Sequence, residues 1–248
     1  MQNSHKQRSQ YGLRRWVLVT GASSGVGRST AILLSQSGFN VLASVRKEAD
    51  SLELQSQNPE YIHPVIIELR DQNTIKNAAQ ITAEKTGDVG LYGLVNCAAM
   101  LHCGPLEYFP RDLWFEQYDV NLFGPIALTQ ALLPVIRKAN GRIVNIGAVG
   151  GGISLPFYGA IASSKIAFEA VSDCLRRELY PFGIHVSIIQ PSGIATPANY
   201  KMRDSVSRFL NDLEPMGKER YGEAMEAFSQ WAFTRHQNSL KPEEVART

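Results

Sequence analysis

Short apolar runs alternate with longer amphipathic stretches along most of this chain. A run of about 4–8 apolar residues between glycine, proline or polar residues is typical of a buried strand, whereas apolar positions three and four residues apart are typical of a helix. The alternation of the two predicts βαβ units and a parallel sheet. The predicted strands cover residues 16–20, 40–45, 62–69, 92–97, 142–147 and 184–190, and the predicted helices cover 26–37, 75–86, about 111–138 and about 158–180.

This order predicts an α/β fold, in which a doubly wound, Rossmann-type parallel sheet of six strands carries helices on both faces. Residues 16–248 contain no internal repeat and no low-complexity linker, so we expect them to form a single domain. Residues 1–15 are polar and basic, and we expect them to be a flexible tail in front of the first strand.

Residues 197–237 depart from the alternation and predict a long, mostly helical insertion. An insertion that follows the sixth strand is expected to cover the carboxyl ends of the strands, where open α/β sheets bind ligands. Its aromatic residues either pack the insertion onto the domain or form the walls of an apolar substrate pocket. These residues are Tyr200, Phe209, Tyr221, Phe228, Trp231 and Phe233.

Composition narrows the class of partner. The formal net charge is only +2 and is not concentrated in one block, which argues against nucleic acid or an anionic membrane surface as the main partner. We find no apolar run of the about 18 residues needed to span a bilayer, and no apolar core in residues 1–15 that would indicate a secretory signal. Cys97, Cys103 and Cys174 are too few and too dispersed for a disulfide framework or a zinc site, so we expect no metal and a reducing, cytoplasmic location.

A glycine-rich turn joins the first predicted strand to the helix that follows it, with the sequence Thr20-Gly-Ala-Ser-Ser-Gly-Val-Gly27. Glycines at this position permit a tight turn, let the backbone approach a pyrophosphate and allow the helix to pack closely on the strand. The free N–H groups at the start of the helix then favour an anion. The sequence therefore predicts a dinucleotide site rather than an empty turn.

The spacing Gly-x-x-x-Gly-x-Gly resembles that of the short-chain dehydrogenase/reductase family. The resemblance continues in order through Asn96-Cys-Ala-Ala99 after the fourth strand, Asn121 in the long helix, residues 141–146 and 181–186, and the loop from Pro191 to Thr196. It is greatest for the branch of steroid- and retinol-dehydrogenase-like enzymes, and it implies a small lipophilic substrate and a homodimer or homotetramer. Family members continue beyond Pro242 into a seventh strand, so either this sequence is part of a longer chain or the sheet ends at its sixth strand.

The resemblance implies a set of cofactor-binding residues. These are Gly21, Ser23, Ser24, Gly25, Val26, Gly27, Ser44, Arg46, Glu68, Leu69, Asn96, Ala98, Lys165, Pro191, Ile194 and Thr196. The second strand ends without the carboxylate that would bind the ribose hydroxyls of NAD(H), whereas Arg46 and Ser44 suit the 2′-phosphate of NADP(H). We therefore expect NADP(H) rather than NAD(H), with a solvent-exposed surface charge as the other interpretation of Arg46.

Two groups that the family uses for proton transfer are absent. In the family a tyrosine precedes a lysine by four residues on one helix, a serine stands thirteen residues before that tyrosine, and a helix asparagine supports them. Lys165 and Asn121 are retained here, but Ile161 occupies the tyrosine position and Ala148 the serine position. Neither side chain can give or take a proton. Tyr158 is a possible substitute acid, although a purely structural role is the alternative for it.

Three functions follow. The first is an NADP(H)-binding enzyme with altered chemistry on a lipophilic molecule, either reducing an activated acceptor such as an iminium ion or an enone, or catalysing a non-redox cyclisation or isomerisation. The second is a catalytically inactive NADP(H)-binding protein that acts as a sensor or a partner subunit. The third is an ordinary alcohol/ketone oxidoreductase with Tyr158 as a displaced acid. Loss of a general acid typically costs about 10²–10⁴-fold in rate, which places the first ahead of the third.

Overall fold

The computed structural model of this protein describes residues 15–149, 154–236 and 239–248. Nearly all of the predicted tail at residues 1–15 thus lies outside the described residues, as does residue 237 at the end of the predicted insertion.

Six parallel strands form one sheet in the order β3-β2-β1-β4-β5-β6, which confirms the doubly wound Rossmann-type fold. The strands are β1 Trp16–Val19, β2 Asn40–Val45, β3 Ile62–Ile66, β4 Leu91–Asn96, β5 Arg142–Ile146 and β6 His185–Ile189. The strand order reverses between β1 and β4, and ligands bind beyond the carboxyl ends of the strands at such a point.

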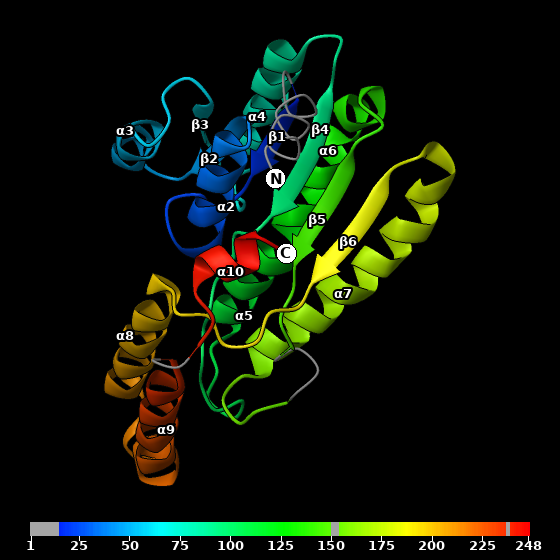
Figure 1. The fold of residues 1–248 in the computed structure, drawn as a ribbon. Helices are drawn as coiled ribbons and strands as arrows, with labels where there is room; N and C mark the ends of the chain where they lie inside the picture. The colour runs from blue at the N-terminus through cyan, green and yellow to red at the C-terminus, as the bar shows by residue number, and fades with distance from the viewer. Residues whose placement is uncertain (1–14, 150–153, 237–238) are drawn as a thin grey trace.

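Helices cover both faces of the sheet (Figure 1). They are α2 Gly25–Gln36, α3 Glu48–Gln55, α4 Gln72–Thr86, α5 Arg111–Tyr118, α6 Gly124–Lys138, α7 Gly159–Leu179, α8 Pro197–Asp212, α9 Pro215–His236 and α10 Pro242–Ala246. Side chains alternate between the faces along β1. Leu18 packs with Leu128 and Leu132 of α6, whereas Val17 and Val19 pack in a second cluster on the face of α2 and α3.

The predicted helix at about 111–138 is interrupted by a π-helical segment, Asp119–Phe123, which separates α5 from α6. Single π-helical turns are frequent at functional sites, and this one carries Asn121. The apolar pattern continues through it, so the sequence alone does not indicate the break.

The stretch Arg111–Lys138 also corrects the expectation that no segment is long and apolar enough to span a bilayer, since by length and composition it is. In this fold 56% of its most apolar window is buried, and Leu128, Leu132 and Ile136 are fully enclosed in the core. A buried core helix of a folded domain passes the same test.

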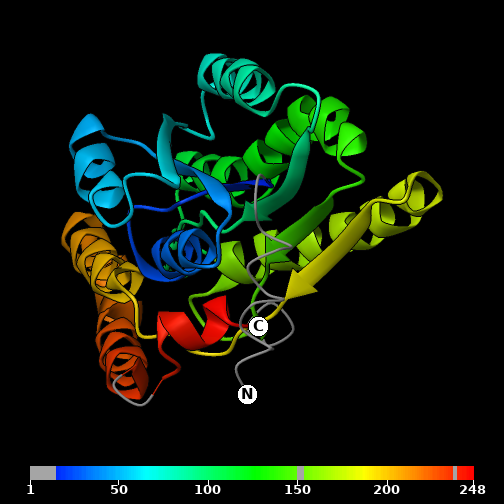
Figure 2. The same ribbon diagram turned by 45° about the horizontal axis from the view of Figure 1, so that its top comes forward.

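Two short helices were not predicted. Helix α3 has few apolar residues, and only Leu54 of it is buried, so its sequence carries almost no periodic signal. Helix α10 is five residues long and begins with Pro242 after Lys241, and a hydrogen bond from the Lys241 backbone N–H to the Glu244 carboxylate closes its first turn. It packs against α2 (Figure 2).

The insertion consists of α8 and α9, joined at Leu213 and Glu214. Figure 1 shows both helices beyond the carboxyl ends of the strands. Rings of α9 contact the segment in front of α7, where Phe228 packs edge-to-face on Phe157 and Tyr158 with centroid distances of 5.5 and 5.4 Å. The insertion is therefore packed onto the domain by its aromatic residues, and it also forms one wall of the cavity described next.

Candidate cofactor and substrate site

A cavity of about 1030 Å³ lies beyond the carboxyl ends of the strands. Its walls come from the glycine-rich turn, from the segments after β2, β3, β4, β5 and β6, from the start of α7, and from α8 and α9. The cavity brings together most of the predicted site. Its lining includes Gly21, Ser23, Ser24, Gly25, Val26, Gly27, Ser44, Arg46, Glu68, Leu69, Ala98, Ala148, Tyr158, Ile161, Lys165, Pro191, Ile194 and Thr196.

The glycine-rich turn has the close packing that a phosphate-binding turn requires. Gly21 has a φ of +66°, and a Cβ there would lie 2.8 Å from the Cα atom of Ala98. At Gly27 a Cβ would collide with the Gly21 carbonyl group. The hydroxyl of Thr20 accepts hydrogen bonds from the N–H groups of Cys97 and Ala98, at 2.9 and 3.0 Å, and so fixes the turn to the segment after β4.

Lys165 lies inside the domain, on the second turn of α7. Only 6% of it is exposed, and its Nζ donates a 2.8 Å hydrogen bond to the carbonyl oxygen of Ile146 at the end of β5. Burial lowers the pKa of the amine from its usual 10.5 to about 8, and the nearby Cys97 thiol acts in the opposite direction. The same burial raises the pKa of the Cys97 thiol to about 12, so this cysteine stays a neutral thiol.

Ile161 precedes Lys165 by one turn of α7 and is 5% exposed. It packs with Met202 and Val206 of α8 and with Cys103. Residues four apart on a helix share a face, so the side chain that stands beside Lys165 in the cavity is a hydrocarbon. Ala148, after β5, also lines the cavity and has no polar side-chain atom.

Tyr158 caps the start of α7, and its hydroxyl donates a hydrogen bond to the Sδ atom of Met202, 3.2 Å away. Burial, and to a lesser degree the neighbouring Cys103, raises the pKa of this phenol. The hydroxyl is thus bonded toward α8, whereas the Lys165 amine is bonded toward β5. No hydrogen bond joins these two side chains in the described part of the chain.

Two predicted residues do not line the cavity. The Asn121 amide bonds the Met100 backbone, accepting from its N–H at 2.8 Å and donating to its carbonyl oxygen at 3.1 Å. Asn121 therefore fixes the segment after β4. The Asn96 amide group, 3% exposed, donates to Asn145 at 2.9 Å and to Thr129 at 3.3 Å. The Asn96 amide is thus turned into the core, and cofactor binding by this residue stays a prediction.

The end of the cavity beside β2 and β3, named here the adenosine end after the ligand expected there, carries Ser44, Arg46 and Glu68. Ser44 is buried at the end of β2, and Arg46 is largely exposed, with its guanidinium 3.9 Å from the Glu68 carboxylate. Glu68 also lies 3.5 Å from Arg70. Its charge is therefore shared between two arginines, and Arg46 stays available to a ligand anion.

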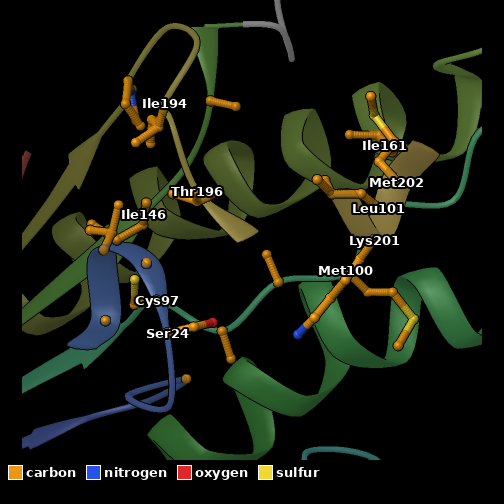
Figure 3. A pocket seen from close by; sticks show the side chains of 18 of the residues that line it. Ser24, Cys97, Met100, Leu101, Ile146, Ile161, Ile194, Thr196, Lys201 and Met202 are labelled. Carbon is orange, nitrogen blue, oxygen red and sulfur yellow. The ribbon is translucent and has the colours of Figure 1, made fainter. Parts of the chain in front are cut away.

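Sequence reasoning missed several cavity residues. The missed residues include Met100, Leu101, Lys201 and Met202 (Figure 3). Arg235 also lines the cavity and was missed. Met100 and Leu101 lie four and five residues after the end of the buried strand β4, and this closeness to a strand end is a signal that could have found them. The residues of α8 and α9 give no such signal, because only the fold shows which face of each helix is turned to the cavity. Among the described residues, no group of three His, Cys, Asp or Glu side chains is placed to hold a metal ion.

Comparison with known proteins agrees with the resemblance seen in the sequence. The family model described as short chain dehydrogenase matches residues 15–207. Retinol dehydrogenase 16 of Mus musculus is 39% identical over 84% of this chain and 67% of its own length, and 17-beta-hydroxysteroid dehydrogenase type 6 of Bos taurus is 36% identical with the same coverage. Dehydrogenase/reductase SDR family member 9 of Bos taurus is 33% identical over 85% of this chain and 66% of its own. The chain thus spans about two thirds of the length of these relatives.

Among solved structures, a short-chain dehydrogenase from Streptomyces avermitilis superposes with a TM-score of 0.76. The two chains are 27% identical, and the match covers 94% of this chain and 81% of the other.

Proposed function

The chain belongs to the short-chain dehydrogenase/reductase family, and we propose that it is an NADP(H)-dependent reductase of lipophilic, activated acceptors that works without a tyrosine proton donor. The observation that carries this proposal is the pairing on α7 of a buried lysine with a hydrocarbon, Ile161, one turn before it. The family binds a nicotinamide dinucleotide, and the choice of NADP(H), the altered chemistry and the substrate class are our proposals.

The residues present fit a dinucleotide. The close approach of Gly21 and Gly27 to neighbouring backbone leaves no room for a side chain at these two positions. The compact turn can thus present its N–H groups to a pyrophosphate. The cavity extends from this turn to Lys165 and Ile161, which gives it room for a dinucleotide and a second molecule. Bound there, NADPH would supply a hydride to the acceptor.

The adenosine end supports NADP(H). Arg46 presents a planar guanidinium that can bind a phosphate with two parallel hydrogen bonds. The carboxylate nearest to it, Glu68, is already engaged by Arg70. A ribose with a free 2′-hydroxyl gains nothing from Arg46, so the cation selects the phosphorylated cofactor.

The catalytic end favours an acceptor that needs no acid at its oxygen. Reduction of an unactivated ketone requires a proton at the oxygen as the hydride arrives, and neither Ile161 nor Ala148 can supply one. In an enone, the hydride adds to the β-carbon, the negative charge moves to the oxygen as an enolate, and the α-carbon then takes a proton from water. The positive charge of Lys165 lies in the same cavity and stabilises that anion.

The charge of the cavity side chains favours an enone over an iminium ion as the acceptor. Within the described parts of the chain, the charged side chains of the cavity are Arg46, Lys165, Lys201 and Arg235 against a single carboxylate, Glu68. A cationic iminium ion is disfavoured by this excess of positive charge, whereas a neutral enone is not. The apolar walls, which include Leu101, Leu155 and Ile161, suit a lipophilic skeleton.

The test of this proposal has two steps. The first is a fluorescence titration of the protein with NADPH and with NADH, for which we expect binding of NADPH at least about tenfold tighter. The second is NADPH consumption with a panel of enone, iminium and ketone acceptors. Tight binding without consumption of NADPH would favour a binding protein or an isomerase, and consumption with simple ketones would favour an ordinary oxidoreductase.

A further inference from the structure

One cation of the cavity has no partner among the residues that the structure describes. Of the four basic side chains there, Lys165 is bonded to the Ile146 carbonyl, Arg46 lies beside Glu68, and the Arg235 guanidinium lies 5.2 Å from the centre of the Trp231 ring. Lys201 makes no hydrogen bond and no ion pair with any described residue, and it is exposed.

The position of Lys201 on α8 directs its side chain toward the glycine-rich turn. Helix α8 begins after Thr196, which lies close to Gly25. A Cβ added to Gly25 would lie 3.2 Å from the methyl group of Thr196. Helical side chains lean back toward the start of their helix, so the long side chain of Lys201 extends toward this contact. Figure 3 shows its amine projecting into the cavity on the side that carries Ser24.

We propose that Lys201 binds the diphosphate of the dinucleotide from the side opposite the glycine-rich turn. This inference rests on the proposed function, because it assigns a further residue to the same cofactor. The turn offers N–H groups but no cation, since Ser23, Ser24, Gly25, Val26 and Gly27 are all uncharged. Lys201 supplies the missing positive charge, and an ammonium group bonds well to phosphate oxygens.

Contact between Lys201 and the diphosphate also couples cofactor binding to the part of α8 that lines the cavity beside Ile161. Met202, the next residue, is 3% exposed, packs with Ile161 and receives the hydrogen bond of Tyr158. A diphosphate that holds Lys201 therefore also holds the turn of α8 that forms the wall beside Ile161. Cofactor binding should thus order α8 before the substrate enters.

The test compares the affinity of matched variants for two ligands, measured by fluorescence titration of the full chain. Lys201→Met should weaken NADPH binding by about tenfold or more, while Lys201→Arg should stay close to wild type. Arg203→Met is the control, because it removes an equal charge from α8 at a residue that does not line the cavity and lies over the Phe233 ring instead. Adenosine 2′-phosphate, which has no diphosphate, should bind Lys201→Met as it binds wild type.

A second measurement follows amide hydrogen exchange across α8. NADPH should slow exchange in wild type and much less in Lys201→Met, and adenosine 2′-phosphate should slow it in neither. Wild-type affinity of Lys201→Met for NADPH would overturn the inference, as would an equal loss of affinity for adenosine 2′-phosphate. If wild type itself fails to bind NADPH, the proposed function fails instead, so the two failures are distinguishable.

Discussion

The Tyr158 hydroxyl and the Met202 sulfur lie 3.2 Å apart, joined by a hydrogen bond that links the start of α7 to α8. A thioether is a weak acceptor, and a phenol placed on it is not aligned for proton exchange with a group held by Lys165. Burial raises the pKa of the phenol and so disfavours the phenolate form that oxidation of an alcohol would need. The tyrosine nearest to Lys165 in sequence thus links α7 to α8.

Replacement of Tyr158 by Phe should therefore leave the rate of reduction of an enone within about twofold of wild type. The ring keeps its contact with Phe228, and only the weak bond to Met202 is lost. Steady-state kinetics with NADPH tests this expectation. A loss of about 10²-fold or more in kcat would instead identify Tyr158 as the proton donor.

Restoring the family pattern should restore ketone chemistry. The double variant Ile161→Tyr with Ala148→Ser places a phenol one turn before Lys165 and a hydroxyl after β5. We expect its rate of ketone reduction to exceed that of wild type by about 10²-fold or more, because a general acid becomes available.

Ile161→Phe with Ala148→Ser is the matched control for that gain, because it adds the same ring without the hydroxyl. An equal gain in the control would show that cavity shape, and not proton transfer, limits the wild-type rate with ketones.

Arg46→Met should weaken binding of NADPH by about tenfold or more and leave the affinity for NADH unchanged. The reason is that only NADPH carries the 2′-phosphate that the guanidinium would bind. Isothermal titration with both cofactors measures the two affinities. Equal weakening of both would indicate that Arg46 acts on the shape of the adenosine end, through Glu68, and not on the phosphate.

The buried amine of Lys165 predicts a pH dependence of stability. Its pKa is about 8 in the folded protein and 10.5 without burial. Between these values the unfolded chain holds a proton that the folded protein has released, so the free energy of unfolding rises as pH increases through this interval. The difference in unfolding free energy between wild type and Lys165→Met, from urea denaturation at several pH values, should shift in favour of wild type from about pH 8 to 10.5. A difference that is independent of pH in this range would contradict the assigned environment.

A hydrogen-bonded network of polar side chains inside the core should be important for stability. Asn145 accepts from Asn96 at 2.9 Å and donates to Ser172 at 2.8 Å, and so ties β4, β5 and α7 together. Asn145→Ala leaves buried groups without partners, and we expect a loss of about 2–3 kcal/mol. Ser187→Ala, at an exposed position of β6, is the control, with a change of about 0.5 kcal/mol or less. Similar urea midpoints for both variants would show that the network contributes nothing.

The sequence predicted the sheet because each strand is a short apolar run next to a helix of clear periodicity. It predicted the glycine-rich turn because the packing around Gly21 and Gly27 excludes side chains. It did not predict α3, in which only Leu54 is buried, nor the π-helical segment around Asn121, whose apolar pattern is continuous. Such features depend on contacts that local sequence does not encode.

The candidate site, like the fold, contains residues that the sequence predicted and residues that it did not. Residues on the strand ends and the glycine-rich turn, such as Ser44 and Pro191, were predicted and do line the cavity. Asn96 was also predicted, but it does not line the cavity, because its amide donates a hydrogen bond to Asn145 on another strand and is turned into the core. Lys201 was missed because its orientation follows from the packing of Thr196 on Gly25, a contact between segments far apart in the sequence.

The central claim is that a hydrocarbon beside Lys165 directs this protein to acceptors that need no acid at oxygen. Product analysis after incubation with NADPH and a lipophilic cyclic enone tests it most directly. We predict the saturated ketone, formed by hydride addition at the β-carbon, and no further reduction of that ketone. The allylic alcohol as product would mean that the carbonyl oxygen is protonated in the site, and it would contradict the account.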